Sequence, residues 1–103
     1  MPKVSVTLPH NMDAKSVQEK AGPIIEKTIK DFEGHDLQLT WTGQKAEFRF
    51  KSLGFSIQGH VAIDDQNITV EINLPIAAIM FKDRVEKGIR KNLGRALGVV
   101  PES

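Results

Sequence analysis

Residues 37–74, LQLTWTGQKAEFRFKSLGFSIQGHVAIDDQNITVEINL, alternate apolar and polar side chains over successive short runs. The turns TGQ and SLG separate the first three runs, and the polar cluster DDQN precedes the last. Alternation predicts half-buried strands, because successive side chains of a strand point to opposite faces of the sheet. The stretch therefore predicts an antiparallel meander of four strands with one apolar and one polar face.

A further strand and a helix are predicted before this meander. KVSVTL (3–8) alternates in the same way. Asn11 or Asp13 can then accept hydrogen bonds from the first turn of a helix whose apolar residues recur at spacings of three and four, as far as Phe32. The glycine of EGHD (33–36) closes this helix.

The middle of the first helix contains the sequence Gly22-Pro23. Proline has no N–H to donate to the carbonyl four residues earlier, and glycine is a poor helix former. We therefore expect a kink or a break there. A final helix is predicted from Pro75 to Gly98, because proline is tolerated in a first turn and apolar residues then recur every four positions.

The predicted order is β-α-β-β-β-β-α in one domain spanning 1–103. A five-stranded, mainly antiparallel sheet with two helices on one face buries every apolar row, which defines an α+β fold. The element order resembles a reduced helix-grip (START-like) domain. Strand order is left open, and the two edges of such a sheet offer a route to oligomers.

The composition excludes several classes of chemistry. The chain has 103 residues, a net charge of +1 and no cysteine, so disulfides, thiolate metal sites and a cysteine nucleophile are absent. The N-terminus lacks the apolar core of a signal peptide, and the run LPIAAIMF (74–81) is too short to span a bilayer. We expect a cytoplasmic protein without a transmembrane segment.

The titratable residues do not form a catalytic pattern. His60 alternates in phase with the polar residues of its strand and is predicted to face solvent, while His10 is expected to fix the corner before the first helix. His35 is expected in a solvated loop. Asp64 and Asp65 are explained by turn propensity. With no nucleophile-elbow or phosphate-loop motif, we expect no enzyme activity, no cofactor, and no catalytic or metal-binding residue.

Charge is concentrated in the last helix. Residues 75–98 carry six Lys or Arg against two Asp or Glu, a net of +4, whereas the rest of the chain has a net of −3. Lys87, Arg90 and Lys91 are candidate contacts for an anionic partner, although cations near a helix C-terminus also stabilise the helix itself. Nucleic acid is not favoured, because no aromatic side chains interleave with cations.

The start of the last helix is apolar on nearly all sides. Ile76, Ile79 and Met80 exceed what one core-facing stripe needs. They either fill the core beneath the sheet edge or form an exposed patch for a protein partner, a lipid or a granule surface.

Several short motifs resemble one bacterial family, the polyhydroxyalkanoic acid system proteins, also called granule-region proteins. The shared motifs run from His10 through WTG (41–43), FRF (48–50) and GFSIQGHVAI (54–63), and close with VEINLP and IRKNL. The chain departs from the family at Gly22-Pro23 and at the glutamine after WTG. The resemblance implies association with storage-polyester metabolism or granules, without a defined active site.

Two functions follow as hypotheses. The first is a non-enzymatic accessory protein that binds a granule surface, an acyl or lipid-like ligand, or a protein partner. The second is a small START-like domain that carries an apolar ligand between the sheet and the last helix. The candidate lining residues, whose other reading is plain core packing, are Trp41, Phe48, Phe50 and Phe55.

Overall fold

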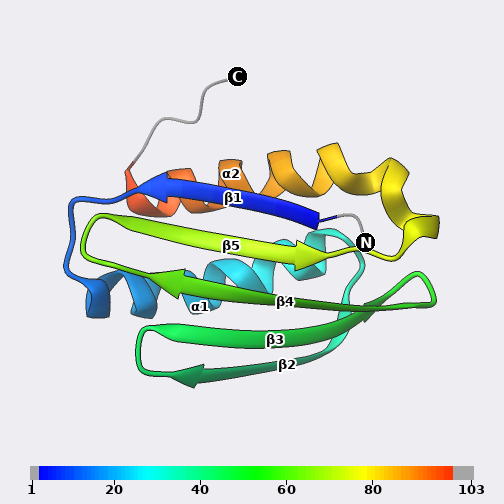
Figure 1. The fold of residues 1–103 in the computed structure, drawn as a ribbon, viewed down its shortest axis with the longest axis horizontal. Coiled ribbons are helices and arrows are strands. Elements are labelled where there is room, and N and C mark those ends of the chain that lie inside the picture. Colours follow the sequence, from blue (N-terminus) through cyan, green and yellow to red (C-terminus); the bar gives the residue numbers. More distant parts are fainter. Residues whose placement is uncertain (1–2, 99–103) are drawn as a thin grey trace.

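The computed structural model describes residues 3–98. It contains a five-stranded sheet, two α-helices and one 3₁₀ segment, in the order expected (Figure 1). The elements are β1 Lys3–Pro9, α1 Ala14–Asp31, β2 His35–Thr42, β3 Lys45–Ser52, β4 Phe55–Ile63, β5 Asn67–Asn73, η1 Ile76–Phe81 and α2 Lys82–Leu97.

The sheet is antiparallel throughout, and its strand order is β1-β5-β4-β3-β2. The strands β2 to β5 form the predicted meander. The first strand closes the sheet beside the last one, with Val6 opposite Val70. β1 is thus both an edge strand and the partner of β5, two arrangements between which the sequence did not decide.

Both helices lie on one face of the sheet (Figure 1). That face carries the alternating apolar rows, and the other face carries the polar residues. The largest fully buried side chains come from the sheet, from both helices and from Leu74 directly after β5. They are Ile68, Leu74, Leu93, Val4, Val6, Val17, Val61 and Val70. The predicted α+β architecture is confirmed.

The first helix is continuous from Ala14 to Asp31. Of the kink or break expected at Gly22-Pro23, the break was wrong. Pro23 is exposed, and Ala21 and Ile25 on either side of it are buried against the sheet. Tertiary packing of the apolar face outweighs the missing hydrogen bond of a single proline. At the start of the helix, Asp13 Oδ1 accepts from the amide of Ser16 at 2.7 Å.

The end of this helix is a Schellman motif in which Glu33, with φ of 60°, takes the left-handed conformation. The amide of Gly34 donates to the carbonyl of Ile29 at 2.8 Å, and that of Glu33 to Lys30 at 2.9 Å. Gly34 is required for space, because a Cβ there would clash with Ile29. The predicted terminating glycine therefore acts through close packing and not through a positive φ.

The predicted final helix is divided into two segments. Residues Ile76–Phe81 form a 3₁₀ segment, and the α-helix begins only at Lys82. Asp83 lies in the first turn of α2, where a negative charge interacts favourably with the helix dipole. The α-helix therefore begins beside this residue and not at Pro75. Gly98, with φ of 73°, ends the helix as predicted.

Candidate functional site

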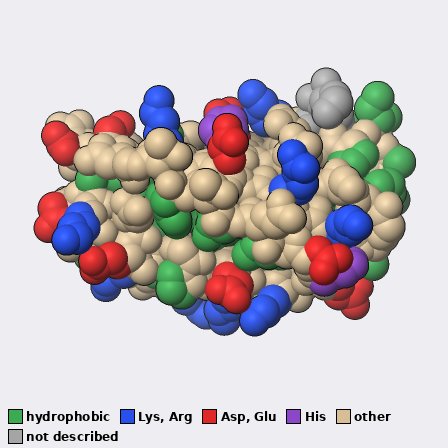
Figure 2. Space-filling view, turned by 90° about the horizontal axis from the view of Figure 1, so that it is seen from below, with side chains coloured by type: hydrophobic (Ala, Val, Ile, Leu, Met, Phe, Trp, Pro, Cys, Tyr) green, Lys and Arg blue, Asp and Glu red, His purple; other side chains and the backbone are tan. Residues whose placement is uncertain are grey.

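Four large apolar side chains are exposed at one end of the molecule. Met80 is 80% exposed, Ile76 74%, Leu53 58% and Ile79 54%. Three belong to η1 and the fourth to the β3–β4 turn, which lies at the same end of the fold (Figure 1). Figure 2 shows apolar side chains gathered at that end. We call Leu53, Ile76, Ile79 and Met80 the apolar end.

The 3₁₀ conformation explains this exposure. Ala78 is the one buried residue of η1, so this segment meets the core through its smallest side chain. Ile76, Ile79 and Met80 consequently point away from the core. The three side chains are therefore exposed and do not fill the core, which was the other interpretation that the sequence allowed.

Leu53 was not identified from the sequence, where SLG was interpreted only as a turn. Leu53 and Gly54 have φ values of 51° and 86°. Turns with two left-handed residues favour Asn-Gly, and a leucine in that conformation is strained by roughly 1–2 kcal/mol. A bulky apolar residue in such a turn is the signal that could have identified it.

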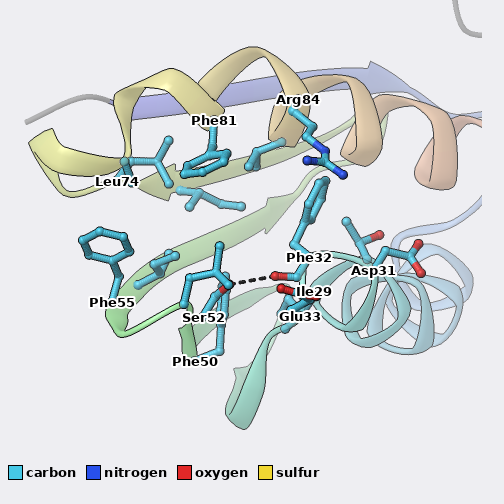
Figure 3. A pocket seen from close by; sticks show the side chains of 16 residues that line it. Ile29, Asp31, Phe32, Glu33, Phe50, Ser52, Phe55, Leu74, Phe81 and Arg84 are labelled. Atoms are coloured by element: carbon cyan, nitrogen blue, oxygen red, sulfur yellow. Dashed lines mark hydrogen bonds between the residues drawn. The ribbon is translucent and has the colours of Figure 1, made fainter.

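A pocket of about 240 Å³ opens beside the apolar end, between the sheet and the two helices. Figure 3 shows side chains converging on it from α1, β3, β4, η1 and α2. The apolar wall consists of Ile29, Phe32, Phe50, Leu53, Phe55, Ile57, Ile72, Leu74, Ala78, Phe81 and Val85. Such a pocket is suited to an apolar ligand of modest size.

Two polar side chains within the pocket are already hydrogen-bonded. Ser52 Oγ donates to the carbonyl of Phe32 at 2.7 Å, which ties β3 to the end of α1. Thr28 Oγ1 donates to the carbonyl of Ile24 at 2.8 Å and accepts from Asn92 at 2.8 Å. The polar groups left to meet a ligand are therefore the charged side chains that line the pocket, Arg84, Asp31 and Glu33.

Arg84 extends from α2 toward Phe32, the residue that follows α1 (Figure 3). Asp31 already contacts Lys27 Nζ at 3.6 Å and Asn92 Nδ2 at 3.4 Å. Glu33 is exposed at the end of α1. With one cation and two carboxylates, this region offers both donors and acceptors but no net attraction for an anion.

The four aromatic residues predicted to line a ligand cavity separate into two pairs. Phe50 and Phe55 line the pocket, whereas Trp41 and Phe48 lie outside it. Phe48 is buried, and its ring centroid lies 6.2 Å from that of Phe50. Trp41 is half-buried on β2, near Gly22 of α1.

The basic residues of α2 differ in their availability. Lys87 and Lys91 are exposed and lie one turn apart, on the same side as Arg84 and Arg95. Arg90 instead contacts Glu86 Oε1 through Nη2 at 3.3 Å and is half-buried. Of the three predicted cationic contacts, Lys87 and Lys91 are the two that face solvent.

The histidines lie in three separate environments. His60 lies on the polar face as predicted, where its Nε2 is 2.7 Å from Glu71 Oε1. This hydrogen bond, with Lys3 nearby, lowers the pKa of Glu71.

His10 is buried at the corner before α1. Its Nδ1 accepts a hydrogen bond from the amide of Met12, so its Nε2 donates to the carbonyl of Asp64 at 2.7 Å. His35 is exposed as expected, but it is the first residue of β2 and not part of a loop.

The polar face of the sheet has a shallow hollow of about 340 Å³. It lies among long side chains from β2 to β5 and includes His60, Arg49 and Glu47. Within residues 3–98, no cluster of three or more histidine or acidic side chains could hold a metal ion. No helix in that same range combines the length and apolar character needed to cross a membrane.

The fold and the site define a small α+β protein with an apolar end and an adjoining apolar pocket. A family model described as "Putative polyhydroxyalkanoic acid system protein" matches residues 4–97, so the chain belongs to that family. No curated protein matches the chain. The crystal structure of TTHA0849 from Thermus thermophilus aligns over 93% of this chain and 97% of its own, with 11% identity and a TM-score of 0.38.

Proposed function

We propose that this protein is a non-enzymatic accessory protein of polyhydroxyalkanoate storage, which binds the polyester granule surface in the cytoplasm through its apolar end. The observation that carries the proposal is the exposure of Ile76, Ile79, Met80 and Leu53 together at one end. Large exposed apolar patches on soluble proteins often mark sites that contact a protein, a membrane or another partner. Membership of a family described as polyhydroxyalkanoic acid system proteins supports the choice of the storage polyester as that partner.

The surrounding charges suit a contact of this kind. The apolar end precedes α2, whose Arg84, Lys87 and Lys91 are exposed. In the proposed contact these cations stay hydrated, because the contact is made by η1 and the β3–β4 turn and not by α2. Burial of Ile76 and Met80 on a polyester surface would supply about 1.5–3 kcal/mol for each side chain.

Co-sedimentation with native granules over a salt series tests the proposal. Binding of the unaltered protein should survive high salt, because apolar contacts are not screened. The double variant Ile76→Ser with Met80→Ser should lose most of the binding. The matched control is Ala77→Ser, an exposed change in the same segment.

The basic side of α2 gives the second control. Lys87→Gln with Lys91→Gln should leave granule binding at high salt unchanged. Two results would contradict a contact made by the apolar end. One is binding of the unaltered protein that is lost at high salt. The other is binding that is lost in the lysine double variant but kept in the double variant at Ile76 and Met80.

A second candidate function rests on the pocket: the protein carries an acyl ligand between the sheet and the C-terminal helix. A volume of about 240 Å³ corresponds to roughly eight water-sized groups, which is enough for a short acyl chain. Arg84 can donate to an ester carbonyl, while Asp31 and Glu33 disfavour a free carboxylate. A hydroxyacyl ester should therefore bind better than its acid.

Chemical-shift titration with methyl 3-hydroxyhexanoate and with 3-hydroxyhexanoate tests this candidate. The ester should shift amides around Phe55, Ala78 and Phe81, and Ala78→Leu, which fills the pocket, should abolish the shifts. Equal responses to the ester and the acid, or shifts that persist in Ala78→Leu, would reject it.

A further inference from the structure

The strand β2 forms an edge of the sheet that has no partner within residues 3–98. It pairs only with β3, and Figure 1 shows no element beyond it. The opposite edge strand, β1, has Lys3 at its start and Pro9 at its end, two residues that hinder strand pairing. α2 also runs along β1 (Figure 1).

Most of β2 lacks the charged residues and prolines that hinder the pairing of an edge strand with another chain. Residues 37–42, LQLTWT, contain no charged residue and no proline. A register shift between His35 and Gln38, with Asp36 at φ of 56°, disturbs only the first part of the strand. A stretch of β-forming residues with unpaired backbone groups is a template for another strand.

The core is also incomplete along this edge. Leu37, Leu39 and Trp41 pack against the core but remain half-buried, whereas Ala46, Phe48 and Phe50 on the neighbouring strand are buried. A strand added beyond β2 would cover the three side chains that the fold leaves partly in water.

We infer that β2 pairs antiparallel with β2 of a second copy of this chain, which joins two sheets into one of ten strands. The sequence is self-complementary when Leu39 lies on the two-fold axis. Leu39 then faces Leu39 of the second copy, and Leu37 faces Trp41. Every core-side residue meets a core-side residue, so the helices of both copies lie on the same face.

The same register avoids electrostatic repulsion. Gln38 faces Thr40, and Asp36 faces Thr42, so no like charges are opposed. In a two-fold symmetric pairing, the same edge strand of each copy forms the interface, so the assembly stops at a dimer. β1 of each copy then lies at an outer edge of the joined sheet. The inference is independent of the proposed granule contact, because the apolar end is formed by other elements.

Because the chain contains no cysteine, single-cysteine variants report the register directly. In the proposed dimer, Cβ atoms at position 39 lie about 5 Å apart, within reach of a disulfide. Atoms at position 37 of the two copies are about 13 Å apart. Under mild oxidation, Leu39→Cys should form a disulfide-linked dimer at least about tenfold faster than the matched control Leu37→Cys.

Sedimentation equilibrium of the unaltered protein completes the test and should show a dimer. Leu39→Lys, which opposes two cations on the axis, should be a monomer with an unchanged circular dichroism spectrum. A monomeric native protein, or cross-linking as fast at position 37 as at position 39, would overturn the inference. If Leu39→Lys unfolds, the cysteine pair still decides the matter.

Discussion

The ring of Phe48 occupies the space in which a side chain at Gly59 would begin. The two residues are directly opposite each other on β3 and β4, and a Cβ built on Gly59 would clash with the Phe48 ring and with the backbone carbonyl oxygen of Glu71 on β5. The glycine in GFSIQGHVAI is therefore a packing requirement at the centre of the sheet.

Gly59→Ala should lower the free energy of unfolding by about 1–3 kcal/mol, because an added methyl overpacks the core. Chemical denaturation measures the loss. In the double variant with Phe48→Leu, the smaller side chain should recover part of it. Strictly additive effects of the two substitutions would show that the contact is not the cause.

His10→Ala should destabilise the protein by about 1–3 kcal/mol, because it removes the hydrogen bond to the carbonyl of Asp64 and leaves a gap at a buried corner. His35→Ala, at an exposed position, is the control and should change stability by less than about 0.5 kcal/mol. Equal effects of the two changes would contradict a structural role for His10. Urea unfolding of both variants at neutral pH gives the comparison.

Pro23→Ala should stabilise the protein by about 1–3 kcal/mol, because α1 is already continuous and alanine restores a backbone donor in mid-helix. Thermal melting measures the gain. Lys20→Ala, an exposed change in the same helix, should have little effect. A lower melting temperature for Pro23→Ala would mean that the helix depends on proline for its local geometry.

Acid should destabilise the fold through three carboxylates. Backbone amides lower the pKa of Asp13 and of Asp64, and the hydrogen bond from His60 lowers that of Glu71. A lowered pKa in the folded state stabilises it above the unfolded value, and this contribution is lost as the pH falls through the folded value. Stability should therefore decline below about pH 4.

Asp64→Asn tests one part of this effect, since Asp64 Oδ1 accepts hydrogen bonds from the backbone amides of both Gln66 and Asn67. The variant should be less stable at neutral pH, and its stability should fall less steeply between about pH 4 and 2. Asp65→Asn in the same turn is the matched control. An unchanged slope for Asp64→Asn would rule out a contribution from this carboxylate.

Alternation by itself determined the strands, the apolar face of the sheet and the outward direction of His60, because a period of two is a local property of the backbone. The short apolar run at 74–81 also indicated the exposed Ile76, Ile79 and Met80 as candidates. The sequence did not show whether these side chains fill the core. In the structure η1 is a 3₁₀ segment that buries Ala78, and this tertiary contact turns the larger side chains outward.

The tertiary structure alone decided the rest. The pairing of β1 with β5, the continuity of α1 through Pro23, and the pocket that includes Phe55 but not Trp41 all depend on contacts between residues far apart in the chain. Local propensity cannot specify such contacts, because their free energy comes from the simultaneous burial of surfaces that meet only when the sheet and both helices are assembled.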